Sequence, residues 1–203
     1  MITIVNYGMG NIQSVLNAFE HLDHAVKVID EPSALAHAEK LVLPGVGSFK
    51  QAAERLDAGF RDALDEAVKG RGCPILGICL GMQLLAARGT EHGESRGLGW
   101  IDGIVEKIPT GGNRLRLPHV GWNGLGQIDR DCPLFASVDD GADCYFVHSY
   151  QLNATDPDDI TAITEYGGTL TAAVARGNVF GTQFHPEKSQ PVGLIMLDAF
   201  ARL

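Results

Sequence analysis

The sequence has no apolar run long enough to cross a bilayer, no basic leader and little positive charge. Its longest apolar stretch, residues 75–87, is interrupted by Gln83, whereas a membrane helix needs about 20 apolar residues. The chain opens on MITIVNYG, a strand-like pattern rather than a signal peptide. Lys and Arg number 16 against 25 Asp and Glu, for a formal net charge of -9, and nucleic acids and anionic membranes require a basic face. These absences predict a cytoplasmic protein without nucleic-acid or membrane partners.

Cysteine is also scarce, and its spacing excludes two kinds of site. The four cysteines stand at positions 73, 79, 132 and 144. None forms the C-x-x-C spacing of a zinc knuckle or a redox pair. In a cytoplasmic protein we therefore expect free thiols.

Two partial motifs for a cofactor or a metal ion are incomplete. GMGNIQS after the first strand imitates a dinucleotide fingerprint, but Gln13 replaces the third glycine. His21, Asp23 and His24 share a predicted helix end without further ligands nearby, which favours a solvated helix end. We expect neither a cofactor nor a metal.

The order of hydrophobic patterns predicts an α/β fold. In the first half, short β-branched runs (ITIVNY, AVKVID, LVLPG, PILGIC) alternate with amphipathic segments at residues 12–22 and 49–68 and an Ala-rich segment between them, as in βαβ units with a parallel sheet. After Gly89, closely spaced runs broken by turn signals predict strands and hairpins, and residues 191–203 have helical spacing. With 203 residues and no linker, we expect one domain, 1–203, with a single mixed sheet. That sheet should be mostly parallel, flanked by helices and extended by antiparallel strands.

One cysteine occupies a position suited to a nucleophile. ILGICLGMQLL places Cys79 between two glycines, where a buried strand ends and a helix predicted over residues 82–88 begins. This is the G-x-nucleophile-x-G turn, in which Gly77 and Gly81 permit close backbone approach. The free N–H groups and dipole at a helix N-terminus favour a thiolate. The alternative is a small apolar residue that fills a tight turn.

A base for this nucleophile is predicted in GTQFHPEKSQ. His185 precedes a proline and is followed two residues later by Glu187. In an extended segment both side chains point to one face, so Glu187 can fix the imidazole tautomer as the third member of a triad. The alternative is an ordinary surface turn.

Attack on an acyl carbon also requires N–H donors for the oxyanion. The amide of Leu80, directly after the nucleophile, is one candidate. LVLPGVGSF contains a glycine-rich loop that can supply the second, although such a loop after a strand is often only a connection.

These motifs together resemble a known family. GICLGMQ with FHPE resembles the Cys-His-Glu triad glutaminases, the class I glutamine amidotransferases, which implies a flavodoxin-like fold. Within that family, IVNYGMGN, PGVGSF, GLGWIDG, PHVGWN, YFVHSY and FHPEKSQ resemble the glutaminase subunits of imidazole glycerol phosphate synthases. The motifs extend from Met1 to Phe200. Asn6 stands where members of the family often carry aspartate, which puts in doubt only a charge near the first loop.

The resemblance implies a mechanism and a set of site residues. Cys79 would attack the side-chain amide of L-glutamine, His185 would protonate the departing ammonia, and Glu187 would orient His185. The amides of Val46 and Leu80 would form the oxyanion hole. The implied substrate contacts are Gly45, Gly47, Gln83, Ser149 and Tyr150.

The resemblance also implies a partner, a (β/α)8-barrel cyclase subunit that forms a heterodimer with the glutaminase. The cyclase would receive the ammonia and make imidazole glycerol phosphate and aminoimidazole carboxamide ribonucleotide in L-histidine biosynthesis. Trp122 in a glycine-rich loop fits an interface anchor, although a core position is the alternative. The docking residues expected are Asn11, His119, Trp122, Asn123, Tyr145 and Lys188.

Two other functions stay open on the sequence. The chain can be the glutaminase of another amidotransferase, such as pyridoxal phosphate or anthranilate synthase, because the triad is shared. It can also be a non-catalytic regulatory subunit of the same fold, although all three triad residues are present.

Overall fold

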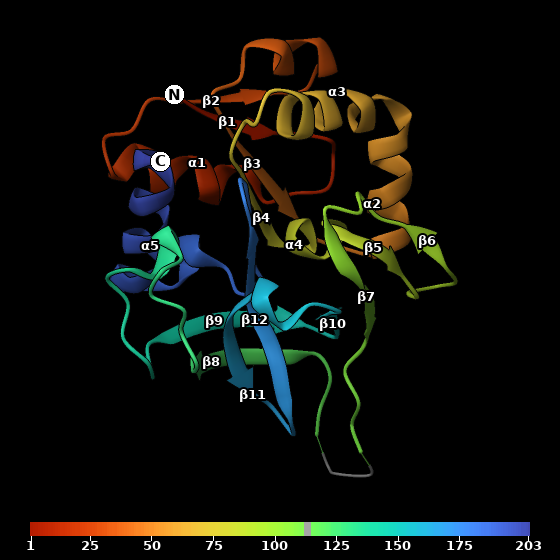
Figure 1. The fold of residues 1–203 in the computed structure, drawn as a ribbon, viewed down its shortest axis with the longest axis vertical. Helices are drawn as coiled ribbons and strands as arrows, with labels where there is room; N and C mark the ends of the chain where they lie inside the picture. The colour runs from red at the N-terminus through yellow and green to blue at the C-terminus, as the bar shows by residue number, and fades with distance from the viewer. Residues whose placement is uncertain (112–114) are drawn as a thin grey trace.

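The computed structural model describes residues 1–111 and 115–203 and is built around a twisted seven-stranded sheet (Figure 1). Five neighbouring strands are parallel, and the last two, β12 and β11, are antiparallel. This confirms the predicted mostly parallel sheet with an antiparallel extension. In sheet order the strands are β11 (Ile160–Glu165), β12 (Thr169–Arg176), β13 (Val179–Thr182), β4 (Ile75–Cys79), β3 (Lys40–Gly45), β1 (Ile2–Val5) and β2 (Val26–Ile29).

Helices cover both faces of this sheet, with α1 and α5 on one face and α2, α3 and α4 on the other (Figure 1). Alternation along β3 explains the two cores, because Leu41 and Leu43 pack into one hydrophobic cluster and Val42 into the other. No helix in the described part of the chain has the length and apolar character needed to cross a membrane. The helices are α1 (Ile12–His21), α2 (Phe49–Arg55), α3 (Arg61–Asp65), α4 (Leu80–Leu84) and α5 (Gln190–Arg202).

The helical segment predicted over residues 49–68 is present but not regular. Two π-helical turns, Leu56–Phe60 and Glu66–Gly70, follow α2 and α3, and Gly59 has a φ of 149° that no regular helix contains. The Ala-rich segment forms a short 3₁₀ helix, Pro32–His37. Further 3₁₀ turns begin at proline, whose fixed φ suits the first helical position: Pro133–Phe135, Pro157–Asp159 and Pro186–Lys188.

The prediction of a single sheet is wrong, because the strands between residues 86 and 154 form two further sheets. A four-stranded sheet has the order β10 (Tyr150–Ala154), β7 (Ile101–Lys107), β5 (Ala86–Gly89), β6 (Ser95–Arg96). A two-stranded ribbon pairs β8 (His119–Gly124) with β9 (Asp143–His148). The helix predicted over residues 82–88 ends at Leu84 because the next residues pair with β7 and β6. Alternating hydrophobicity identifies strands but not their partners.

Close backbone packing of α4 on β3 and β4 fixes the turn that carries Cys79. A Cβ added at Gly81 would lie 1.8 Å from the Leu43 carbonyl oxygen, and one at Gly77 would lie 2.6 Å from the Gly81 oxygen. Neither neighbour is a flexible side chain. The requirement for glycine at both positions, predicted from the sequence, is confirmed.

Substituting Gly81 by alanine should therefore destabilise the protein strongly. We expect Gly81→Ala to lower the free energy of unfolding by about 1–3 kcal/mol or more, because the β3 backbone must move. Gly126→Ala is the matched control, since its added Cβ would meet its nearest atom at 3.8 Å. Urea titrations of both variants measure the difference, and a Gly81→Ala protein as stable as Gly126→Ala would contradict the packing argument.

Candidate active site

Cys79 lies at the carboxyl end of β4, in a strained backbone conformation. Its φ of 56° and ψ of -111° are rarely adopted by residues other than glycine. Such strain persists only where the surrounding packing enforces it, and it is typical of a nucleophile turn. The turn places the side chain at the start of α4, almost wholly buried but facing a pocket.

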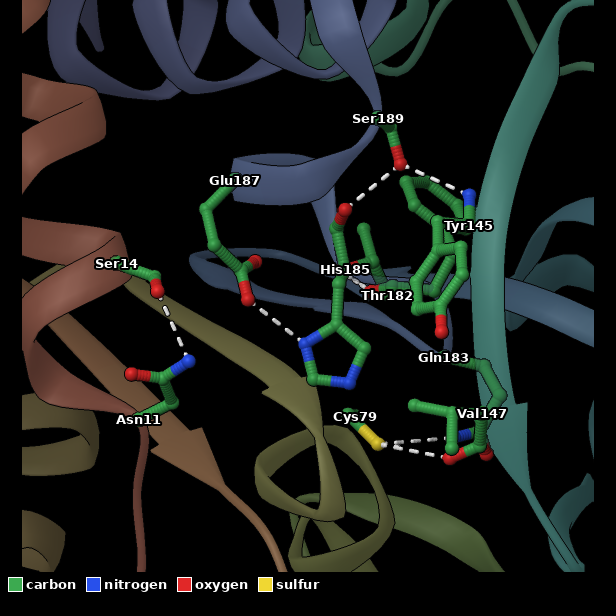
Figure 2. A network of polar contacts seen from close by, with 11 residues as sticks. Asn11, Ser14, Cys79, Tyr145, Val147, Thr182, Gln183, His185, Glu187 and Ser189 are labelled. Carbon is green, nitrogen blue, oxygen red and sulfur yellow. Dashed lines mark hydrogen bonds and ion pairs between the residues drawn. The ribbon is translucent and has the colours of Figure 1, made fainter. Parts of the chain in front are cut away.

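His185 lies beside Cys79 because β13, which precedes it, is the parallel neighbour of β4. Its Nδ1–H donates to Glu187 Oε1 over 2.7 Å, with both side chains buried. His185 is extended as predicted, but Glu187 belongs to the Pro186–Lys188 turn and reaches the ring from that turn. Figure 2 shows the imidazole between the carboxylate and the sulfur, with Nε2 on the sulfur side.

The backbone of His185 is held by the neighbouring ribbon and by the start of α5. Its N–H donates to the Tyr145 carbonyl over 2.9 Å. Ser189 Oγ–H donates to the His185 carbonyl over 2.7 Å and accepts from the Tyr145 N–H over 3.0 Å. Hydrogen bonds to Tyr145 and Ser189 thus hold the backbone of His185, which positions its ring (Figure 2).

The surroundings of His185 favour its protonated form. Burial lowers the pKa of His185, but the neighbouring Cys79 and Glu187 outweigh burial and raise it to about 9. Nε2 has no hydrogen-bond partner among the described residues. The site therefore holds a proton next to the sulfur that is not committed to another acceptor.

Gln183 adjoins the sulfur and Gln83 adjoins Gln183, and sequence reasoning identified only Gln83. Gln183 Nε2 lies 3.7 Å from the Cys79 sulfur, and the sulfur lies 3.9 Å from the Val147 carbonyl oxygen (Figure 2). Gln83 Nε2 donates to Gln183 Oε1 over 2.9 Å and to the Tyr150 carbonyl over 3.0 Å. Gln183 stands two residues before His185, so strand alternation places both on one side, and that spacing is the signal that was missed.

These side chains border a pocket of about 270 Å³. Most of the residues predicted for the substrate and the oxyanion line it, whereas Gly45 lies behind it, packed against the backbone of α4. The lining also includes residues without a sequence motif, such as Glu91. The full lining is Val46, Gly47, Cys79, Leu80, Gln83, Glu91, Pro118, Val147, His148, Ser149, Tyr150 and His185.

Glu91 gives the pocket a carboxylate. Its Oε2 accepts the N–H of Phe49, the first residue of α2, over 2.7 Å, and a helix N-terminus favours such an anion. Glu91 stands in a turn between β5 and β6, where no spacing pattern distinguishes it from a solvated acid. Only the fold reveals it.

The predicted second oxyanion donor is not directed at the pocket in this structure. The Val46 N–H donates to the Met9 carbonyl over 2.8 Å. The Leu80 amide is the first of α4, where N–H groups have no partner within the helix. One of the two predicted donors is thus engaged elsewhere.

The residues expected at a docking face divide into an exposed group and a buried group. Trp122 is 49% exposed and Val120 on the same strand is 55% exposed. Tyr145 packs edge-on against Trp122 with ring centroids 5.9 Å apart, and Lys188 Nζ lies 5.9 Å from the Tyr145 centroid. Asn11, half-buried, donates to Ser14 Oγ over 2.9 Å.

His119 differs from the expectation of a surface contact. It is only 3% exposed, with its ring stacked on Tyr166 and Phe146 at centroid distances of 4.0 and 4.9 Å. Strand alternation explains this, since the neighbouring Val120 points outward. Asn123 lies on the inner side with His119 and donates to the Glu165 carbonyl over 2.9 Å.

A strained cysteine at a strand-to-helix turn, a buried histidine and a carboxylate behind it form the arrangement of a cysteine triad. The family model for glutamine amidotransferase class-I matches residues 3–200. The chain belongs to the class-I glutamine amidotransferase family.

Curated relatives of this glutamine amidotransferase match along almost its whole length. The imidazole glycerol phosphate synthase subunit HisH of Agrobacterium fabrum is 44% identical, and the alignment covers 99% of this chain and 98% of the relative. The subunit of the same name from Syntrophotalea carbinolica is 46% identical, with 98% of each chain covered. That of Bacillus licheniformis is 44% identical over 98% of this chain and 95% of the relative.

Solved structures support the fold of this amidotransferase. A structure described as PurLQS from Thermotoga maritima superposes with a TM-score of 0.77 at 19% identity, covering 99% of this chain and 97% of that one. A crystal structure of a glutamine amidotransferase gives 0.76 at 19% identity, covering 100% and 99%. At this identity the likeness shows the fold alone.

The raised pKa of His185 should be measurable and should depend on Glu187. A histidine whose pKa is raised by folding contributes its full stabilisation below its ordinary pKa near 6.5 and loses it as the pH rises through about 9. We expect NMR titration of the His185 ring to give a pKa well above 6.5 and Glu187→Gln to move it down. In urea titrations, the free energy of unfolding of the wild type should exceed that of Glu187→Gln below pH 6.5, and this difference should shrink as the pH rises to about 9. An unshifted His185 in the wild type would contradict this electrostatic account.

Proposed function

We propose that this amidotransferase is the glutaminase subunit of an imidazole glycerol phosphate synthase. It hydrolyses L-glutamine to glutamate and ammonia and delivers the ammonia to a cyclase subunit. The observation that supports glutaminase activity is the 2.7 Å hydrogen bond from His185 to Glu187, beside the strained Cys79. The names of its 44–46% identical relatives support the assignment to the synthase.

In the proposed mechanism the Cys79 sulfur attacks the side-chain amide carbon of glutamine. The C–N bond breaks as His185 donates its proton to the departing nitrogen, and a thioester with Cys79 results. Water then attacks the thioester and gives a proton to His185. Glutamate leaves, and the Cys79 thiolate beside the protonated His185 is restored. Glu187 holds Nδ1–H, which leaves Nε2 for the proton transfers.

The pocket offers contacts for the amino-acid end of the substrate. Glu91 suits the ammonium group, since it is the carboxylate in the lining and its Oε2 is held by the Phe49 amide. The backbone at Ser149 and Tyr150 borders the same space. We assign Gly47 and Gln83, which line the pocket, to substrate binding with them, whereas Gly45 lies behind the lining against Gly81.

The Val46 amide provides a reason for low activity of the isolated subunit. While it donates to Met9, the tetrahedral intermediate lacks one of the proposed oxyanion donors, and one such donor is worth about a hundredfold to a thousandfold in rate. Rotation of the Gly45–Val46 peptide would free this N–H. We therefore propose that glutamine hydrolysis is weak alone and strong when the cyclase and its nucleotide are bound.

The proposed docking face is formed by Trp122, Val120, Tyr145, Lys188 and Asn11. An exposed aromatic residue supported by a second aromatic ring suits the centre of an interface. The proposed partner is a (β/α)8-barrel cyclase, which uses the ammonia to form imidazole glycerol phosphate and aminoimidazole carboxamide ribonucleotide for L-histidine biosynthesis. We place the heterodimer in the cytoplasm, where free thiols such as the four of this chain are stable.

Removing the nucleophile tests the mechanism directly. Cys79→Ala should lower cyclase-coupled glutamine hydrolysis at least about a thousandfold, because no thioester can form, while ammonia-supported cyclase activity persists. Cys73→Ala is the matched control, a buried cysteine outside the pocket lining. Glutamate release assayed with the purified cyclase and its nucleotide provides the measurement. Retained hydrolysis in Cys79→Ala would show that another group is the nucleophile.

Removing the exposed tryptophan tests the docking face. Trp122→Ala should raise the Kd for the cyclase roughly 30-fold or more, as expected for a central aromatic residue worth about 2 kcal/mol. Its circular dichroism and melting temperature should match wild type, since the side chain is half exposed. Val28→Ala, at an exposed position on the edge strand β2, serves as the control. Equal affinities in titration calorimetry would place the interface elsewhere.

A further inference from the structure

The ribbon of β8 and β9 places two buried histidines directly opposite each other. His119 pairs with His148 in the ladder, and His119 Nδ1 lies 3.0 Å from His148 Nε2. Both side chains are buried, at 3% and 5% exposure. His148 lines the pocket, whereas His119 lies behind it. The proposed mechanism uses neither ring.

The polarity of this hydrogen bond follows from the groups at its two ends. His148 Nδ1 lies 2.8 Å from the Tyr150 carbonyl oxygen, which can only accept, so Nδ1 carries the proton. A neutral His148 then accepts at Nε2, and His119 must donate from Nδ1. His119 Nε2 accepts in turn from Asn123 Nδ2 over 3.3 Å.

The orientation of the Asn123 amide is fixed independently. Its Oδ1 accepts the Gly124 N–H over 2.9 Å, and its Nδ2 donates to the Glu165 carbonyl over 2.9 Å. The amide nitrogen therefore faces His119. In the series of hydrogen bonds from Asn123 through His119 and His148 to the Tyr150 carbonyl, every donor has one acceptor.

The series continues from the Tyr150 carbonyl to the nucleophile. That carbonyl also accepts from Gln83 Nε2, whose second hydrogen goes to Gln183 Oε1. The Gln183 amide nitrogen is then directed at the Cys79 sulfur. Hydrogen bonds thus connect β8, which carries Trp122, with the reacting atom.

We propose that His119 and His148 are positioning residues, a neutral imidazole pair that fixes the Tyr150 carbonyl and, through it, the pocket wall that holds glutamine. This inference rests on the proposed glutaminase function and adds two residues to it. A protonated ring at either place would present a second N–H to a donor and break the series. Neither ring needs to contact substrate to act.

Burial keeps both rings uncharged. Burial, together with the smaller effects of the nearby His119 and His185, lowers the pKa of His148 to about 4 despite the hydrogen bond to Tyr150. Burial also lowers the pKa of His119. His119 is also stacked on Tyr166 and Phe146. The direction of its Nδ1–H is set by the hydrogen bonds at its two ring nitrogens, and these do not involve Tyr166.

The test separates the hydrogen bond from the packing. His119→Phe keeps an aromatic ring but removes the donor. We expect the KM for glutamine in the cyclase complex to rise about threefold to tenfold, which corresponds to the loss of one buried hydrogen bond. The kcat should stay within about twofold of wild type. His119→Asn places an amide N–H close to the position of Nδ1 and should restore most of the KM. Tyr166→Leu removes the stacking partner and keeps the donor, so its KM should stay near wild type.

An unchanged KM in His119→Phe, the same rise in Tyr166→Leu or no recovery in His119→Asn would overturn the proposal. A second measurement does not depend on activity. Histidine ¹⁵N NMR at neutral pH should show His148 as the neutral Nδ1–H tautomer, with its signals assigned by their loss in His148→Asn. An imidazolium or the Nε2–H tautomer would overturn the proposal. A wild-type complex without glutaminase activity would instead contradict the proposed function, and the tautomer would still decide this inference.

Discussion

The close approach of the α4 backbone to β3 is the constraint on which the site depends. With only hydrogen at Gly81, the first turn of α4 lies against the Leu43 carbonyl, and the chain must reverse sharply at Cys79 to get there. The left-handed conformation of Cys79 is the local result. The sulfur is thereby held at the carboxyl edge of the parallel sheet, where the neighbouring strand β13 delivers His185.

The two parts of the proposed catalytic machinery, the His185–Glu187 pair and the Val46 amide, differ in how nearly they are in position for the reaction. The groups proposed for proton transfer are in place, because His185 is hydrogen-bonded to Glu187 and its raised pKa keeps a proton near the sulfur. The proposed oxyanion hole is incomplete, because the Val46 N–H donates to the Met9 carbonyl. This division fits a subunit whose nucleophile is assembled in advance and whose intermediate is stabilised only after a change in one peptide.

The sequence was sufficient for the elements that local patterns determine. The parallel strands, the C-terminal helix and the glycines around Cys79 follow from periodicity and steric demands within a few residues. The separation of the later strands into three sheets did not follow, because alternation along β7 or β8 is the same whichever partner they choose. Glu91 and the burial of His119 were likewise missed, since each depends on a residue at least 29 positions away along the chain. Gln183 was missed although its two-residue spacing from His185 was available in the sequence.

The β8–β9 ribbon extends from the exposed face of the protein to the pocket. The ribbon is a sheet of its own, yet Val147 and His148 on β9 form one wall of the pocket while Trp122 stands exposed on β8. A rigid-body tilt of this ribbon would change the width of the cleft without breaking a single ladder bond of the central sheet that anchors the sulfur. A force applied at Trp122 would therefore reach the pocket wall formed by Val147 and His148 through the paired strands of the ribbon.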